Sequence, residues 1–383
     1  MNHIQILILL LSIECILSTI SKSSRDERAK TSSKISNFND LITENPKYKD
    51  IIQEHESFSL AQTGIRNFNN IVLGYVTPWN NHGYDIAKIF GSKFTMISPV
   101  WLQLKPKLSN SFAIEGKHDI DKKWIIDVKR SNKIVSIVPR LIFEEWSYDS
   151  VMNLIENSNF LNEICVELID LAKKNDFDGY VLELWNILSG KLKIKLINVI
   201  QNIANKFQEN KLHVILVIPP PIYSNGMMSS IHKEDIKTLS PYITAFSLMT
   251  YDYSSIERPG PNSPLQWIQE CMNVLLSDAE QTFKNKMLLG LNFYGNDYKN
   301  GGGGGPIIGN QYINMLTKYK PKIKWDKKHG EHYFNYKTDS GSGTVYYPSL
   351  QSIKLRLQLA EEFGIGVAIW EIGQGLDYFY NLF

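Results

Sequence analysis

The stretch FDGYVLELW, residues 177–185, decides how this chain folds. It is a short run of apolar residues that contains one carboxylate, Glu183, and ends in Trp185. Nearly continuous apolar runs of this length are typical of strands buried on both faces, as in parallel sheets covered by helices. The stretch therefore predicts a strand of a parallel sheet, with one carboxylate close to its carboxyl end.

Seven further runs of this kind occur in the chain, at residues 70–76, 94–102, 134–142, 213–219, 245–252, 287–295 and 366–373. Amphipathic helical patterns lie between them; two examples are Leu196, Ile200, Ile203, Phe207 and Leu265, Ile268, Met272, Leu275. Eight strand–helix units in about three hundred residues fit a closed barrel better than an open doubly wound sheet. We therefore expect an α/β fold, a (β/α)₈ TIM barrel, over residues 66–383.

The last unit is longer than the others, which predicts an insertion at about residues 296–348 between strand 7 and helix 7 of the barrel. It contains the run GGGGG, residues 301–305, without the Gly-Lys-Ser/Thr that completes a phosphate-binding loop. We expect a flexible loop there. Residues 323–348 alternate like two or three short antiparallel strands with turn residues in DSGSG. The insertion is thus expected to be small and β-rich, and not an independent domain.

The first residues resemble a targeting segment. An apolar stretch at residues 4–13 is too short to span a bilayer, so residues 1–21 are expected to be a signal peptide. Residues 22–65 are polar and are expected to form an arm that packs on the barrel only near its end. We expect secretion or delivery to the lysosomal lumen, with no membrane span after signal removal.

Composition excludes several classes of protein. The net charge is +2, and no lysine or arginine stripe interleaved with aromatics is convincing enough to indicate nucleic-acid binding. Cys15 would be removed with the signal, and Cys165 and Cys271 are expected to be small buried side chains, not a disulfide. No cofactor or metal is expected.

Aromatic and acidic side chains recur where the predicted strands end. Because the sites of TIM barrels lie at the carboxyl ends of the strands, these residues are candidates for a ligand site. Aromatic rings there offer flat apolar surfaces to the C–H faces of sugars, although each could equally fill the core. The candidates are Trp79, Trp101, Trp146, Trp185, Tyr251, Asp252, Tyr294, Trp370 and Glu371.

Several motifs together resemble glycoside hydrolase family 18. FDGYVLEL is similar to the family's fourth-strand signature DGxDxDxE, in a degenerate form. LMTYDYSS with GPNSPLQW resembles the sixth-strand motif, LGLNFYG the seventh, and GVAIWEIGQG the eighth. The resemblance covers residues from about 70 to the end, and within the family it is closest to chitinase-like lectins. It implies a TIM barrel and an oligosaccharide ligand, with a protein receptor as a further possible partner.

The resemblance places Val181, Glu183 and Trp185 at the three acidic positions of the signature. In active members the last of these acids protonates the glycosidic oxygen, and the middle one supports the substrate's own acetamido group in the reaction. An indole has no proton to give, so Trp185 cannot be the acid. Period-two alternation predicts that all three side chains point inward. Glu183 would lie about 6.5 Å below the acid's position, too deep for proton transfer.

The resemblance therefore predicts a lectin that binds N-acetylglucosamine-containing oligosaccharides, such as chitin oligomers, and is not an enzyme. The expected ligand-binding residues are Trp370, Tyr251, Glu183, Trp185, Asp252, Tyr294, Trp79 and Trp146. Two alternatives remain open at this point. One is a glycoside hydrolase with a relocated acid, for which Asp252, Glu371, Glu144 and Glu145 are available. The other is a protein-binding scaffold with a vestigial groove.

Overall fold

The computed structural model describes residues 38–107, 111–185, 192–339 and 341–383. The expected signal peptide, residues 1–21, and the beginning of the polar arm lie outside the described residues. Among the residues described, no helix is both long and apolar enough to cross a lipid bilayer.

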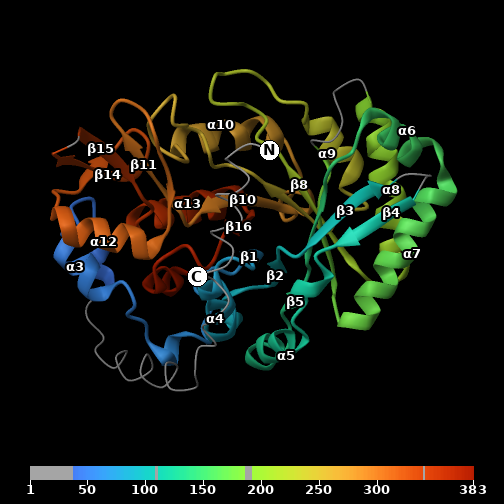
Figure 1. Ribbon diagram of the computed structural model, residues 1–383, viewed down its shortest axis with the longest axis horizontal. Coiled ribbons are helices and arrows are strands. Elements are labelled where there is room, and N and C mark those ends of the chain that lie inside the picture. The colour runs from blue at the N-terminus through green and yellow to red at the C-terminus, as the bar shows by residue number, and fades with distance from the viewer. Residues whose placement is uncertain (1–37, 108–110, 186–191, 340) are drawn as a thin grey trace, which may run out of the picture.

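Parallel strands close into the expected α/β barrel (Figure 1). Neighbouring strands pair in parallel around the ring, and the first strand pairs with the last at Leu73 and Ala368. All eight apolar runs contribute strands to the ring. The strands are β1 (Val72–Val76), β2 (Met96–Pro99), β5 (Ser136–Ile137), β6 (Arg140–Phe143), β7 (Gly179–Glu183), β8 (His213–Ile218), β9 (Ala245–Leu248), β10 (Met287–Asn292) and β16 (Gly366–Trp370).

The third apolar run, residues 134–142, differs from the expectation because it forms two short strands, β5 and β6, instead of one. β5 pairs with β2, whereas β6 pairs with β7 and with an additional strand, β3 (Leu102–Lys107). β3 forms an antiparallel hairpin with β4 (Ser111–Glu115), which the apolar pattern did not predict because its outer half is polar and exposed. The division falls at Val138 and Pro139, and proline lacks the N–H that a continuous ladder requires.

Helices cover the outside of the barrel, and the two predicted helical patterns form α8 and α10 (Figure 1). In α8 the expected apolar face is buried from Leu196 to Phe207. Cys165 and Cys271 are free and buried on α7 and α10, as expected. The helices are α4 (Asn81–Ile89), α5 (Lys122–Ser131), α6 (Tyr148–Glu156), α7 (Ser158–Asn175), α8 (Lys193–Glu209), α9 (Lys233–Leu239), α10 (Leu265–Leu276), α11 (Gln281–Lys284) and α13 (Leu350–Phe363).

Two hydrophobic clusters hold this arrangement. The larger one lies between the strands and the surrounding helices. The smaller one fills the inside of the barrel and includes Leu73, Val138, Val181, Ile215 and Ala368, with Trp370 packed against it. Alternate residues of each strand supply the two clusters, because successive side chains of a strand point to opposite faces.

The insertion lies where the sequence predicted it, between β10 and α13, and is more extensive than the expected two or three strands. It is a five-stranded antiparallel sheet in the order β12-β11-β15-β14-β13, accompanied by a helix, α12 (Gly309–Tyr319). The glycine run is not a loop throughout: Gly301–Gly303 form a turn, whereas Gly304 and Gly305 belong to β12. The strands are β11 (Gly295–Lys299), β12 (Gly304–Ile307), β13 (Lys324–Asp326), β14 (Glu331–Thr338) and β15 (Gly341–Tyr346).

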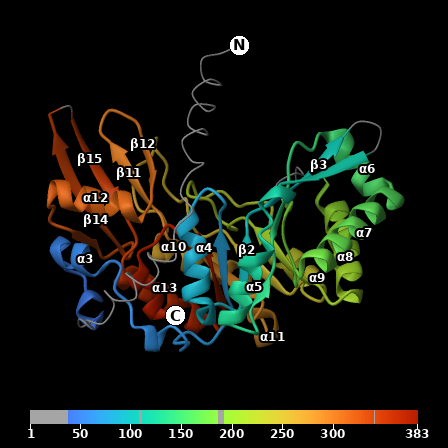
Figure 2. The same cartoon turned by 60° about the horizontal axis from the view of Figure 1, so that its bottom comes forward.

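The polar arm is packed over more of its length than expected. Its helix α3 (Tyr48–Glu54) lies against α12 of the insertion (Figure 1), and Ile51 is buried there. Phe38 and Leu41 also pack on the main hydrophobic cluster. Figure 2 shows the insertion on one side of the barrel and β3 with α6 on the other.

Candidate functional site

The carboxyl ends of the barrel strands bring together a group of aromatic and charged side chains. Glu183 ends β7 and Trp370 ends β16, while Tyr251 and Tyr294 lie directly after β9 and β10. Sequence analysis predicted all four as ligand contacts. Below them Val181 is fully buried in the inner cluster, so it fills the barrel instead of facing a ligand.

Glu183 is paired with Arg140, a residue that the sequence analysis did not select. Arg140 Nε donates to Glu183 Oε2 at 2.6 Å, and the two side chains are 14% and 23% exposed. The guanidinium carbon also lies 5.7 Å from the centre of the Trp370 ring, within the range of a cation–π contact. The signal that could have found Arg140 is its position as the only charged residue within the apolar run 134–142.

Tyr75 is a second residue that the sequence analysis missed. Its ring lies 5.2 Å from the Trp370 ring, and its hydroxyl donates to Ser247 Oγ at 2.9 Å. Burial raises the pKa of Tyr75, so its hydroxyl stays protonated and remains a donor. Trp370 is half-buried, which leaves part of its ring accessible to a ligand.

Tyr251, Asp252 and Tyr294 form a polar corner beside this group. The Tyr294 hydroxyl donates to Asp252 Oδ1, and the rings of Tyr251 and Tyr294 meet edge to face at 6.4 Å. Gly290 makes room for this packing, since a Cβ atom there would lie 2.9 Å from the Tyr251 ring. The Asp252 carboxyl reaches solvent, yet the surrounding protein raises its pKa through desolvation, and the bond from Tyr294 opposes that rise.

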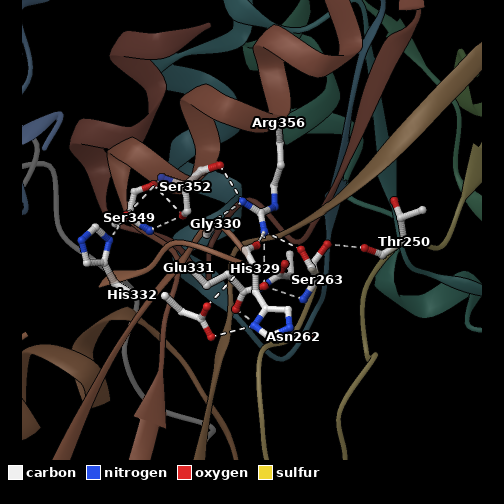
Figure 3. Close-up of polar contacts among 12 residues, drawn as sticks. Thr250, Asn262, Ser263, His329, Gly330, Glu331, His332, Ser349, Ser352 and Arg356 are labelled. Atoms are coloured by element: carbon white, nitrogen blue, oxygen red, sulfur yellow. Dashed lines mark hydrogen bonds and ion pairs between the residues drawn. The ribbon is translucent and has the colours of Figure 1, made fainter. Parts of the chain in front are cut away.

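The loop that carries this corner is held by a buried ion pair from the insertion and α13 (Figure 3). Glu331 accepts the backbone N–H groups of Asn262 at 3.0 Å and Ser263 at 2.6 Å. Arg356 lies 3.3 Å from the Glu331 carboxylate and also donates to the Ser263 carbonyl. The Asn262 side chain in turn accepts the N–H of Asp252 at 2.7 Å. A continuous set of hydrogen bonds therefore links the insertion to the site.

The expectation that Trp185 points inward as a ligand contact is wrong. Trp185 is 3% exposed and packs in the outer cluster, and its indole N–H donates to Ser230 Oγ at 3.0 Å. The physical reason is that β7 ends at Glu183, so strand alternation does not extend to Trp185. Trp101 is likewise fully buried, with its indole N–H donated to Tyr84.

Two predicted contacts lie apart from this group. Trp79 follows β1 and is 70% exposed, with no ring contact recorded among the described residues. Trp146 packs against Phe143, and its indole N–H donates to the Leu104 carbonyl at 2.9 Å. Trp146 therefore supports the β3–β6 edge of the sheet, and the structure does not bring either residue against Trp370.

The other carboxylates considered as relocated acids are engaged elsewhere. Glu371 is fully buried and accepts bonds from the Asn80 amide and the Gly373 N–H. Burial raises the pKa of Glu371 to about 7. Glu144 and Glu145 pair with Lys105 on the surface. Within the described residues, no group of three or more histidine, cysteine or carboxylate side chains could hold a metal ion.

Solved structures of similar fold include chitinases and a spore cortex-lytic enzyme. A chitinase from Chromobacterium violaceum has 18% identity and a TM-score of 0.70, with 82% of this chain and 98% of that chain covered. The spore cortex-lytic enzyme SleL of Bacillus megaterium has 20% identity and a TM-score of 0.67, with 82% of this chain and 73% of that chain covered. A family 18 chitinase from Cycas revoluta, solved in complex with (GlcNAc)4, has 14% identity and a TM-score of 0.67, covering 81% and 97%.

At these identities the likeness to solved structures concerns the fold. The sequence itself matches Glycosyl hydrolases family 18 over residues 71–375, a range that includes every strand of the barrel and the whole insertion. The chain belongs to glycosyl hydrolases family 18.

Proposed function

We propose that this protein is a chitinase-like lectin that binds N-acetylglucosamine-containing oligosaccharides without hydrolysing them. The observation that carries the proposal is the position of the family's proton donor, which is occupied by Trp185. Its indole N–H has no acidic proton and is donated to Ser230. General acid catalysis needs a carboxylic acid within hydrogen-bond reach of the leaving oxygen, and Trp185 cannot supply one.

The neighbouring carboxylate does not replace the missing acid. Glu183 Oε2 accepts the Nε–H of Arg140 at 2.6 Å, so this carboxylate is already held in an ion pair within the protein. It also lies two residues before the family's acid position, about 6.5 Å deeper by the rise of a strand, which is too far for proton transfer to the leaving oxygen. Glu183 is thus suited to orient a ligand N–H or hydroxyl group, as a binding residue would.

The remaining residues of the site support binding of a sugar. Trp370 offers a partly accessible ring supported by the ring of Tyr75, and Tyr251 and Asp252 supply polar groups that are also partly accessible. Stacking on an aromatic face with nearby polar groups is the usual way in which proteins hold pyranose rings. The solved complex of the Cycas revoluta chitinase with (GlcNAc)4 supports this class of ligand.

The proposal is tested on the purified protein with a glycan array, followed by incubation with the best ligand and mass analysis for cleavage. We expect retention of N-acetylglucosamine oligomers and no cleavage products between about pH 4 and about pH 8, the range in which a glycosidase acid would act. Turnover that disappears on substitution of one carboxylate would show that the protein is an enzyme.

One observation favours the alternative of a hydrolase with a relocated acid. Desolvation raises the pKa of Asp252, and the Tyr294 hydroxyl contacts its carboxyl group, so Asp252 can retain a proton at higher pH than an ordinary aspartate. In that case Asp252→Asn would abolish cleavage and leave oligosaccharide affinity nearly unchanged. Under the lectin proposal Asp252→Asn alters affinity alone.

We also propose that the protein is secreted or delivered to the lysosomal lumen. The support is the short apolar stretch at residues 4–13, which has the length of a signal-peptide core. Deletion of residues 1–21 should retain a tagged protein in the cytosol, whereas the intact chain should enter the secretory pathway.

A further inference from the structure

The insertion sheet has one face that is not covered by its helix. Phe334 and Tyr336 of β14 pack against Tyr312 and Tyr319 of α12, with the two ring pairs at 6.2 Å and 4.5 Å. Successive side chains of a strand point to opposite faces, so Tyr333 projects from the side of the sheet away from α12.

Strand register extends this uncovered face across three strands. Tyr333 of β14 is paired with Tyr346 of β15 on one side and with Lys324 of β13 on the other. The Tyr333 and Tyr346 rings are stacked at 5.3 Å and 19°, and Lys324 Nζ lies 5.7 Å from the Tyr333 ring. Both tyrosines are half-buried and Lys324 is exposed, so each can be reached from solvent.

Lysines continue along the edge of this face. Lys320, Lys322 and Lys324 are exposed, whereas Pro321 and Ile323 between them are buried. Lys320 caps α12 in the left-handed region with a φ of 44°, and Lys322 leads from there to Lys324 of β13, so the three lysines follow one another along the exposed edge of the sheet.

The positive charge of this segment is not neutralised within the protein. Residues 318–328 contain six lysines and one aspartate, although the whole chain has a net charge of only +2. In the described part of the chain, none of the six lysines forms an ion pair with a carboxylate, and the aspartate, Asp326, is bonded to His329 at 2.7 Å. Clustered charge of one sign raises the local concentration of ligands of the opposite sign.

We propose that Lys320, Lys322, Lys324, Tyr333 and Tyr346, the lysine–tyrosine face, bind acidic oligosaccharides. Carboxylate or sulfate groups of the ligand pair with the three lysines. The C–H surfaces of its rings contact the accessible edges of the two tyrosines, whose hydroxyl groups donate hydrogen bonds. This binding does not require that the central site bind sugar.

Two other anionic partners fit this face less well. Single-stranded nucleic acid is held by bases stacked on free aromatic faces, but Tyr333 and Tyr346 already stack on each other and no arginine accompanies them. A membrane surface is held by apolar side chains as well as by charge. Among the described residues, no large hydrophobic side chain of the insertion is exposed.

The test measures binding of the full protein to a heparin octasaccharide, with chitohexaose and a single-stranded oligodeoxynucleotide of equal charge in parallel. The triple variant Lys320→Gln/Lys322→Gln/Lys324→Gln should weaken heparin binding by at least about tenfold at low salt and flatten its salt dependence. Tyr333→Ala should weaken it to a smaller extent. Chitohexaose binding should not change in either variant.

A matched control removes the same charge elsewhere. Lys123, Lys133 and Lys173 are exposed, form no ion pair within the described part of the chain, and lie on or next to α5 and α7. Their triple glutamine variant should bind heparin as the parent does. An equal loss of heparin binding in this control would show that binding depends only on the net charge of the protein, and it would overturn the proposal.

Two further outcomes would also overturn the proposal. In the first, the Lys320→Gln/Lys322→Gln/Lys324→Gln variant binds heparin as tightly as the parent does. The other is tighter, Tyr333-dependent binding of the oligodeoxynucleotide, which would assign the face to nucleic acid. If the parent binds heparin but not chitohexaose, the result counts against the central lectin site and leaves this proposal intact.

Discussion

Arg140 and Glu183 make the floor of the site an ion pair, where active members of the family are expected to have a set of acids. Only Nε of Arg140 is used in this pair, and its guanidinium lies beside Trp370. A guanidinium has five N–H donors, so this one can also donate to ligand oxygens. Under the proposed function, Arg140 would donate hydrogen bonds to a ligand at the floor of the site.

The first residue-scale prediction concerns this pair. Glu183→Gln should destabilise the protein by about 1–3 kcal/mol, because it leaves a mostly buried guanidinium without its counter-charge. The double variant Arg140→Gln/Glu183→Gln should recover part of that loss, since neither buried charge remains. Urea unfolding of the three proteins measures both effects. Equal stability of the parent and Glu183→Gln would show that the pair contributes nothing to the fold.

Trp370 gives the second prediction at this scale. Burial of one face of its ring by a sugar should contribute about 1–3 kcal/mol, so Trp370→Ala should weaken (GlcNAc)4 binding by about ten- to a hundredfold. Tyr148, which is 67% exposed at the start of α6, supplies a control aromatic, and Tyr148→Ala should bind as the parent does. Calorimetric titration of folded protein measures the difference. Unchanged affinity in Trp370→Ala would place the sugar elsewhere.

At the residue scale, the sequence predicted which side chains at strand ends lie together, but it did not predict the direction of side chains in the loops that follow the strands. Glu183, Tyr251, Tyr294 and Trp370 lie together because strand ends in a barrel share one edge. Trp185 does not, because the direction of a side chain after the end of a strand depends on the loop and not on alternation. Arg140 was missed because its partner, Glu183, is 43 residues away and only the closed barrel brings them together.

The element that defines one side of the site is the connection from β9 to α10. Its two ends are joined through Thr250, which accepts from Ser263 Oγ, and through Asp252, which donates its N–H to Asn262. Asp252 has a φ of 58°, in the left-handed region that non-glycine residues adopt at a cost of about 1 kcal/mol or more. The surrounding hydrogen bonds must therefore hold this conformation.

Glu331→Gln tests that role. The amide replaces one of the two acceptor oxygens with a donor, so it cannot accept both N–H groups, and it leaves Arg356 without a counter-charge. We expect a loss of about 3–5 kcal/mol in stability and faster hydrogen exchange at the amides of Asp252 and Tyr253. Weaker (GlcNAc)4 binding should follow, because the Tyr251–Asp252 corner is displaced.

Asp178→Asn is the control for this element. Asp178 also accepts a backbone N–H, that of Ile137 at 2.7 Å, and pairs with Lys129, but it lies at the amino end of β7. It should lower stability without selective exchange at residues 250–263. If exchange at Asp252 and Tyr253 in Glu331→Gln rises no more than in Asp178→Asn, the ion pair does not position the loop.

For whole strands and helices, the hydrophobic pattern of the sequence predicted some elements and missed others. Eight apolar runs and the helical patterns between them predicted the barrel because both depend on local burial. The β3–β4 hairpin and the full extent of the insertion sheet depend on pairing between segments whose outer faces are polar, as in β14, where Asn335 and Lys337 alternate with Phe334 and Tyr336. Such strands resemble loops in a hydrophobicity pattern, since only one face is buried.

At the scale of the whole molecule, the barrel, the insertion and the arm are joined by buried polar groups as well as by the core. Glu331 and Arg356 connect the insertion to α13, and His332 of β14 is bonded to Ser349 (Figure 3). His332 is also bonded to the Glu44 carbonyl of the arm. Burial lowers the pKa of His332 to about 4. Burial raises the pKa of Glu331, so the stability of the molecule depends on pH through groups shifted in both directions.

Glu371 gives the clearest pH effect. Burial raises its pKa from 4.5 to about 7 in the folded protein, against the bonds from the Gly373 N–H and the Asn80 amide. Between these two values the folded state binds more protons than the unfolded state. Stability therefore falls as pH rises from about 4.5 to about 7, by at most about 3 kcal/mol for this group. His332 acts in the opposite direction, because its lowered pKa destabilises the fold as pH falls below 6.5.

Glu371→Gln isolates the first contribution, because glutamine keeps the shape of the protonated acid and does not titrate. The free energy of unfolding of the parent minus that of the variant should fall by about 3 kcal/mol between about pH 4.5 and about pH 7.5, while the His332 contribution cancels. Urea unfolding at intervals of about half a pH unit measures this difference. A pH-independent difference would show that the pKa of Glu371 is the same in the folded and unfolded states. The contribution of Glu371 to stability is therefore lost on leaving an acidic compartment, whereas that of His332 is gained over nearly the same pH range.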